Sequence, residues 1–360
     1  GYGTQKKSDL TGSISSVSSK DVKNYAVSNV SQLLTGKAAG VFVSSSSGQP
    51  GESAIVRVRG LGSVNDNNPL YIVDGQPLDN LNNLNPSDID RIEVLKDASA
   101  SSIYGSRAAA GVILITTKKG TTGKLNVSYS GRFSYAQPTN LIEQVTNYAD
   151  YMEWINESFE NIGQNKHYSQ STIDLWREKS LDPNGLNENG VPNYVAYPNT
   201  DWQKAIFKHG IIQDHNVSVN GGTDKLRVLM SAGYLDNPGL VDNTGIKKYS
   251  LRANIEAKIN KWLTLGTRTY ASQLDQDPGN FDNVNNYLRQ TNPGVYPEWN
   301  GKYGAPEAPE EIATTNSILS FLNGENGEKQ KTRFNTTLYT SISPIKGLSW
   351  DFNLNYQRYW

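Results

Sequence analysis

The sequence predicts a small α+β domain followed by the antiparallel strands of an incomplete transmembrane β-barrel. Three observations predict this arrangement. Up to Gly120, short apolar runs are separated by helix-start signals and glycine turns. After Gly120, apolar and polar residues alternate with a period of two over long stretches, as they do along strands with two unlike faces. The connections between these stretches are alternately long and short.

The composition of the 360-residue chain fits a β-rich protein and argues against several functions. Its 20 tyrosines and 32 glycines favour strands and turns. A net charge of −1 lacks the excess of basic residues that is typical of nucleic-acid-binding proteins. Without cysteine there is no disulfide framework, thiolate metal site or cysteine nucleophile. The longest apolar run, about 108–115, is shorter than the roughly 18 residues of a transmembrane helix, so we expect strands to cross any bilayer.

The elements of the first domain follow from local signals in chain order. A short helix over 28–40 starts at a Ser-Asn cap and ends at a glycine. Strands are predicted at 41–43, 54–59 and 69–73, and the Asp74-Gly75 pair after the last of these is typical of a hairpin turn.

The second half of this domain contains two further strands and two helical segments. A helical turn opens at Asn-Pro-Ser-Asp, 85–88, and a strand follows at 91–95. Asp97 is expected to cap a helix over 98–104 that stops at Gly105, and a β-branched run over 111–117 closes the domain.

About seven strands are predicted after Gly120, most of them close to the ~10 residues that cross a membrane at a tilt. Along 248–259, Tyr249, Leu251 and Ile255 lie on one face and charged residues on the other, which could not sit in a dry core. We therefore expect the apolar face to point outward. The seven strands are expected at about 124–135, 213–220, 225–235, 248–259, 263–272, 333–343 and 348–357.

Loop length predicts which end of the strands is extracellular and which is periplasmic. The predicted long connections are 136–212, 236–247 and 273–332, and the short ones lie near 221–224, 260–261 and 344–347. Outer-membrane barrels have short periplasmic turns and long extracellular loops. A soluble β-sandwich would keep its loops short at both ends. Within the first loop, an amphipathic pattern over 147–162 predicts a helix that packs on its own loop.

Several motifs in the first domain form an ordered set: VRG, YIVDG, RIEVLKD, IYGSRAAAGVI and ITTKKG, after an opening GYGTQKK. This set resembles the plug domain of TonB-dependent outer-membrane transporters, in the SusC-like (SusC/RagA) branch of Bacteroidetes. The resemblance implies a plug over 1–120 and the N-terminal part of the barrel over 121–360, about seven strands of an expected ~22. It also implies that the chain is an N-terminal fragment that lacks the TonB box preceding the GYGTQKK motif.

The resemblance points to charged residues that would meet the inner barrel wall. In the family, the VRG and IEV motifs contact the wall through charge pairs, which corresponds here to Arg59 and Glu93, with Arg57 and Arg107 beside them. The alternative is that these are solvated strand faces of a soluble domain. The turn and motif residues implied for the plug are Gly60, Asp74, Gly75, Tyr104, Gly105 and Gly111.

By resemblance the whole protein imports an oligosaccharide, or a peptide, across the outer membrane and is not an enzyme. Its expected partners are TonB with ExbB and ExbD, a SusD-like surface lipoprotein, outer-membrane lipid and the cargo. No cofactor, metal site or catalytic residue is predicted, and the substrate contacts are left open. One alternative is a siderophore or cobalamin receptor of the same architecture. Another, from a different class, is a β-sandwich surface protein that binds without transporting.

Overall fold

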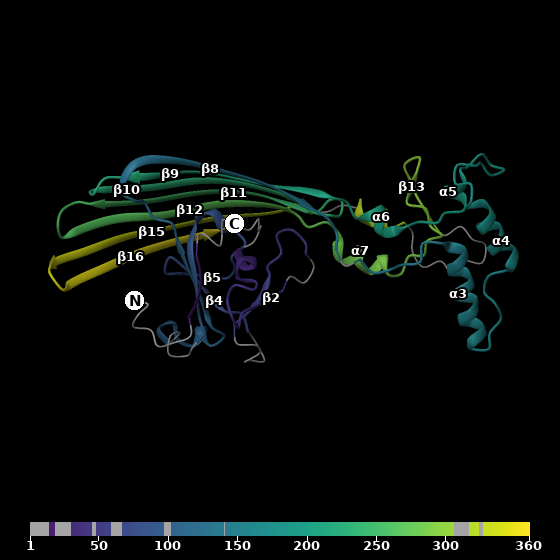
Figure 1. Ribbon diagram of the computed structural model, residues 1–360, viewed down its shortest axis with the longest axis horizontal. Coiled ribbons are helices and arrows are strands. Elements are labelled where there is room, and N and C mark those ends of the chain that lie inside the picture. Colours follow the sequence, from purple (N-terminus) through teal and green to yellow (C-terminus); the bar gives the residue numbers. More distant parts are fainter. Residues whose placement is uncertain are drawn as a thin grey trace.

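The computed structural model describes residues 14–18, 30–44, 48–58, 67–96, 102–139, 141–305, 317–323 and 327–360. Within these ranges the strands form one five-stranded sheet, one seven-stranded sheet and two smaller pairs. In Figure 1 the long seven-stranded sheet curves over the small N-terminal domain, and the helices of the connections lie beyond one end of the strands. The predicted fold class, a mixed domain followed by antiparallel strands that do not close a barrel, is confirmed.

The N-terminal domain is built on a mixed sheet in the order β1-β6-β7-β4-β5. All neighbours are antiparallel except β4 and β7, which run parallel. The strands are β1 (Ile14–Ser18), β4 (Leu70–Val73), β5 (Gln76–Leu78), β6 (Ile89–Leu95) and β7 (Val112–Thr117), with a separate pair β2 (Phe42–Ser44) and β3 (Ile55–Arg57). Three 3-10 helices are η2 (Val30–Leu34), η3 (Pro86–Asp88) and η4 (Ser102–Ala108).

The core of this domain lies around its central strands, because β4 and most of β7 are apolar on both faces. Ile92 of β6 and Ile113 of β7 have no exposed surface. The predicted hairpin joins β4 to β5 through Asp74 and Gly75, whose φ angles of 49° and 88° fit a tight turn. The Asp74 carboxylate accepts hydrogen bonds from the backbone N–H and hydroxyl of Thr117, at 3.0 and 2.5 Å. This turn is therefore held against the end of β7.

Some elements of this domain differ from those that the local sequence signals predict. Strand β1 was not expected, since its polar sequence carries little apolar signal. The described part of the predicted 28–40 helix is the short 3-10 helix η2. The predicted stop at Gly105 holds, because this residue is non-helical with φ of 70° and separates two short helical turns within η4. Asp97 and the start of the predicted 98–104 helix lie outside the described residues.

The seven predicted long strands are confirmed, and each pairs with the next in the chain as an antiparallel meander. They are β8 (Gly123–Ala136), β9 (Gly210–Gly222), β10 (Leu226–Pro238), β11 (Gly245–Lys258), β12 (Leu263–Asp277), β15 (Lys329–Ile345) and β16 (Leu348–Tyr359). Several extend further toward the long-loop end than the alternation indicated. The predicted long connection at 236–247 is wrong, because β10 and β11 stay paired as far as Pro238 and Gly245.

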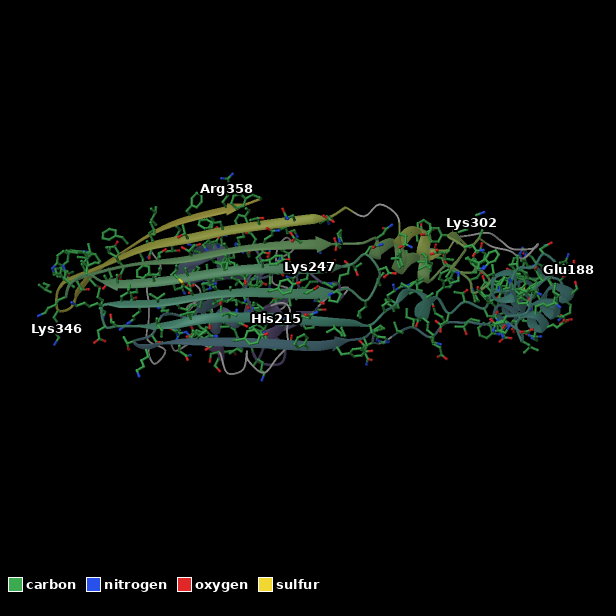
Figure 2. All side chains as sticks on the ribbon, turned by 90° about the horizontal axis from the view of Figure 1, so that it is seen from above. Glu188, His215, Lys247, Lys302, Lys346 and Arg358 are labelled. Atoms are coloured by element: carbon green, nitrogen blue, oxygen red, sulfur yellow. The ribbon has the colours of Figure 1, made fainter. Side chains whose placement is uncertain are left out.

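The two faces of the long sheet are oriented as predicted. Leu251 and Tyr249 of β11 are 61% and 46% exposed, whereas Lys248 and Arg252 on the opposite face are 3% and 5% exposed. The charged face is buried because it lies against the N-terminal domain. Figure 2 looks onto the outer face, on which Lys247 and His215 are labelled. The apolar face therefore points away from the domain, as a lipid-facing surface would.

The two longest connections are folded rather than loose. They contain α3 (Tyr148–Asn161), α4 (Gln170–Lys179), α5 (Asn193–Ala196), α6 (Trp202–Ile206), α7 (Phe281–Leu288) and α8 (Ile318–Leu322), with a hairpin of β13 (Glu298–Trp299) and β14 (Lys302–Tyr303). The predicted amphipathic helix is α3, which packs Tyr148 and Met152 against Trp176 of α4 in the same loop. None of the described helices is long and apolar enough to span a bilayer.

The outward apolar face leads to a stability prediction for the full-length protein in vesicles. Replacing Leu251 by Arg should destabilise the folded barrel by about 2–4 kcal/mol, because lipid offers a mid-strand guanidinium no solvation. Urea titration would measure this change. The control is Lys247→Arg on the same face nearer the loops, which introduces the same side chain without adding a charge and should unfold like the parent. Equal unfolding midpoints for Leu251→Arg and the parent would show that this face does not contact lipid.

Candidate functional site

Many contacts between the N-terminal domain and the long sheet come from residues 82–88, which we call the docking segment. Its sequence, Asn-Asn-Leu-Asn-Pro-Ser-Asp, forms a tight turn into β6. The Asn85 side chain caps η3 by accepting a hydrogen bond from the Ser87 N–H at 2.9 Å, and Pro86 occupies the first helical position, where no N–H is needed. This cap fixes Asp88 at the point where the segment faces the sheet.

A buried ion pair joins the docking segment to the wall. Arg252 Nε donates to Asp88 Oδ2 at 2.9 Å, and the two side chains are 3% and 4% exposed. The Ser231 hydroxyl donates to the other Asp88 oxygen at 2.6 Å. Arg252 also donates through Nη1 to the Thr117 hydroxyl at 3.2 Å and lies 3.8 Å from an Asp74 oxygen. One barrel arginine thus holds the docking segment, the end of β7 and the β4–β5 turn together.

The surroundings of this ion pair explain why it can be buried. Two charges withdrawn from water are stable only if further hydrogen bonds satisfy their remaining donors and acceptors. Here Ser231 and Thr117 supply such bonds, and the Tyr270 ring lies 4.8 Å below the Arg252 guanidinium carbon. Breaking a buried pair by removing one partner typically costs about 3–5 kcal/mol. Removing either partner alone would therefore leave an uncompensated buried charge where the domain meets the sheet.

Hydrogen bonds to uncharged groups extend the attachment along β11. The Lys248 ammonium donates to the backbone carbonyls of Asn82 and Leu84 at 3.2 and 3.0 Å. Toward the opposite end of the strand, Asn254 donates to the carbonyl of Lys118 at 2.6 Å. Between them, Asn85 donates to the Ser250 hydroxyl at 3.2 Å. Alternate inward residues of β11 thus contact the domain from the docking segment to the end of β7. They are Lys248, Ser250, Arg252 and Asn254.

The docking segment lies directly against Gly233 of β10. A Cβ atom at this position would overlap the Asn85 amide and come within 2.7 Å of the Ser250 hydroxyl. The absence of a side chain therefore lets the docking segment lie directly on the sheet.

A second set of contacts involves Gln76 of the β4–β5 hairpin. Its amide donates to the Thr337 hydroxyl of β15 and to Asn355 of β16, the latter at 2.7 Å, and its carbonyl accepts from Gln357 at 2.7 Å. At the end of the sheet nearest the long loops, Gln276 donates to the carbonyl of Pro50 at 3.3 Å. These contacts are hydrogen bonds between polar groups, which favours a docked domain that can separate from the wall. The Tyr270 ring of β12 also packs against the apolar core of the domain.

Two of the charged residues singled out from the sequence, Arg57 and Glu93, make contacts within the N-terminal domain. Arg57 donates to Asn68 at 2.7 Å inside the N-terminal domain. Burial raises the pKa of the nearby Tyr71 to about 12, and the positive charge of Arg57 opposes this rise. Glu93 pairs with Arg91 at 3.6 Å. Neither Arg57 nor Glu93 bonds to the long strands within the part of the chain that the structure describes.

The remaining predicted site residues are placed as follows. Arg107 is exposed, and Arg59 and Gly60 lie outside the described residues. Tyr104 packs partly buried against the cluster formed by Leu70, Ile72, Leu95, Ala108 and Val112. Gly105 and Gly111 have φ angles of 70° and 98°. Gly111 also faces Val58 so closely that a Cβ there would come within 2.8 Å of it.

Sequence reasoning missed the residues that make the observed ion pair. Asp88 was read as part of a helical turn and Arg252 as one of many polar residues on an inward face. The available signal was the combination of an acidic residue in a capped turn and a charged inward strand face, which would need a partner of opposite sign.

Residues 6–112 match the model of the TonB-dependent Receptor Plug Domain. The TonB-dependent receptor P26 of Formosa agariphila is 38% identical over 286 residues, covering 78% of this chain and 27% of that protein. The TonB-dependent receptor SusC of Bacteroides thetaiotaomicron is 36% identical over 266 residues, covering 71% of this chain and 24% of SusC. The chain spans about a quarter to a third of the length of the curated relatives it matches.

The structure of the RagAB peptide importer in the open-open state superposes with a TM-score of 0.77 at 26% identity, covering 100% of this chain and 42% of that one. More distant matches include the ferric enterobactin receptor PirA of Pseudomonas aeruginosa, at 23% identity. The docked domain and the strands around it are thus those of a TonB-dependent receptor. Within that class, the chain belongs to the SusC-like branch.

Proposed function

We propose that the protein imports an oligosaccharide or peptide nutrient across the outer membrane in a TonB-dependent manner. In this proposal a plug of about residues 1–120 gates the barrel whose first strands lie in about 121–360. The observation that carries the proposal is the docking segment, which is fixed to the polar inner face of the long sheet by the Asp88–Arg252 ion pair. A polar, hydrogen-bonded interface suits a plug that must stay docked at rest and separate when work is done on it.

The proposed partners supply the energy and the cargo. A barrel of ~22 strands leaves a lumen that a plug must fill, so passage needs the plug to rearrange. TonB, energised by ExbB and ExbD, would pull on the chain before the plug, and a SusD-like lipoprotein would deliver the cargo from the cell surface. We also propose that Arg57, Arg59, Glu93 and Arg107 face parts of the wall beyond the seven strands, since these strands do not close a barrel.

The similar proteins favour some classes of cargo over others. The structural match at 26% identity is described as a peptide importer, and SusC-like receptors match at 36–38% identity. The siderophore receptor PirA matches at 23% identity, which makes iron-complex uptake the weaker alternative. A gene for a SusD-like lipoprotein beside this one would support nutrient uptake, and iron-acquisition genes in its place would support the alternative.

The experiment that tests the function compares cells with and without TonB. Cells that express the full-length protein should accumulate labelled oligosaccharide or peptide mixtures, and loss of TonB should remove this accumulation while leaving the protein in the outer membrane. Accumulation at equal rates in both strains would replace the active transporter by a passive pore.

A further inference from the structure

Strand β15 carries a row of basic residues on its inward face. We call Lys329, Lys331 and Arg333 the basic ladder. They alternate with Gln330 and Thr332, so all three point to the same side of the sheet. Their partners on β12 are Gln276, Leu274 and Ser272, which are 8%, 1% and 4% exposed on the face that meets the plug.

The basic ladder lies at the rim of the docked plug. Gln276, opposite Lys329, donates to the carbonyl of Pro50, so the outer end of the ladder is level with plug residue Pro50. Lys329 and Lys331 are exposed, whereas Arg333 is 2% exposed. The ladder thus runs from the side of the long loops down to the edge of the plug–wall interface.

Within the described part of the chain, the basic ladder lacks the carboxylate partners that three other inward arginines have. Among the described residues, the inward Arg132, Arg227 and Arg252 pair with Asp214, Glu256 and Asp88 respectively. Within the residues that the structure describes, no carboxylate forms an ion pair with Lys329, Lys331 or Arg333.

Arg333 has an additional unmet requirement. Its Nη2 donates to the Tyr359 hydroxyl, and its guanidinium carbon lies 4.7 Å over the same ring, but its Nε is buried without an acceptor. A buried, charged donor without an acceptor is costly, so it marks a place for an anionic oxygen.

We infer that the basic ladder binds the carboxylates of an acidic peptide in extended form during import. Its charges repeat every second residue, about 6.6 Å apart, which is the spacing of same-face side chains along an extended peptide. A peptide with acidic residues at alternate positions could place its carboxylates on Lys329 and Lys331, the two exposed steps of the ladder, next to the buried Arg333. This inference rests on the proposed import function and specifies the chemistry of its cargo.

The experiment measures binding of a synthetic peptide of alternating Glu and Thr to the purified full-length protein in detergent. At low ionic strength, Lys329→Gln with Lys331→Gln should weaken the Kd by about five- to tenfold, since partly exposed charge pairs contribute modestly. A peptide with Gln in place of Glu should bind weakly and equally to both proteins. The matched control is Lys247→Gln with Lys346→Gln, which removes two lysines from outside the lumen (Figure 2) and should leave the Kd unchanged.

Three results would overturn the inference. They are equal binding of the acidic peptide by the ladder variant and the parent, an equal loss in the control variant, and tighter binding of an acidic oligosaccharide than of the peptide. If any of these occurs while uptake of nutrient mixtures still requires TonB, the inference fails and the proposed function stands. Loss of TonB dependence would instead remove the function itself.

Discussion

Deletion of about residues 1–120 from the full-length protein should convert it into an open pore. The inner face of the long sheet is polar, as Lys248, Ser250 and Arg252 show, and it is covered by the plug in the intact structure. Once uncovered, a lumen of ~22 strands would hold water and conduct ions. We therefore expect large, TonB-independent single-channel conductance in planar bilayers, with no concentrative uptake in cells.

The control for this deletion is the intact protein in cells without TonB. It should show neither conductance nor uptake, because the plug then stays docked and no work is done on it. A deletion variant that inserts into the outer membrane yet conducts no ions would mean that the plug does not fill the lumen.

Replacement of Asp88 by Asn in the full-length protein should release the plug from the wall far more easily. The change leaves Arg252, only 5% exposed, as a buried charge without its main counter-ion. We expect docking to weaken by about 3–5 kcal/mol. Limited proteolysis across a urea series, which reports when the plug becomes cleavable, would measure the change.

The matched control is Asp90→Asn, two residues away at the start of β6, because Asp90 is exposed. This variant should release its plug at the same urea concentration as the parent. The double variant Asp88→Asn with Arg252→Gln should lie between the two, since it removes the uncompensated charge. Identical proteolysis of Asp88→Asn and Asp90→Asn would show that the ion pair does not hold the plug.

Much of the barrel portion could be predicted from sequence because its faces meet different environments. One side of each strand meets an apolar phase and the other a polar plug, so period-two alternation is strong along β8, β11 and β16. Strand ends were harder to place. Around Pro238 and Gly245 the sequence is rich in turn-forming residues, so the alternation fades and a paired region was predicted as loop.

The interface was less predictable because its contacts are distant in the chain. Asp88 and Arg252 are 164 residues apart, and no local pattern links them. Reasoning from motifs instead drew attention to Arg57 and Glu93, which the structure places in contacts within the plug. Strand alternation predicts which residues face inward. Which plug residue each of them contacts depends on how the plug docks against the sheet.

The central claim, that the plug must leave the wall for import, is tested most directly by a reversible cross-link. Asn85 and Gly233 lie against each other across the interface, and the chain has no cysteine of its own. In the Asn85→Cys, Gly233→Cys variant of the full-length protein, oxidation should form a disulfide and abolish TonB-dependent uptake. A reductant should restore it, and each single variant should be unaffected by oxidation. Normal uptake by a fully cross-linked population would contradict the account.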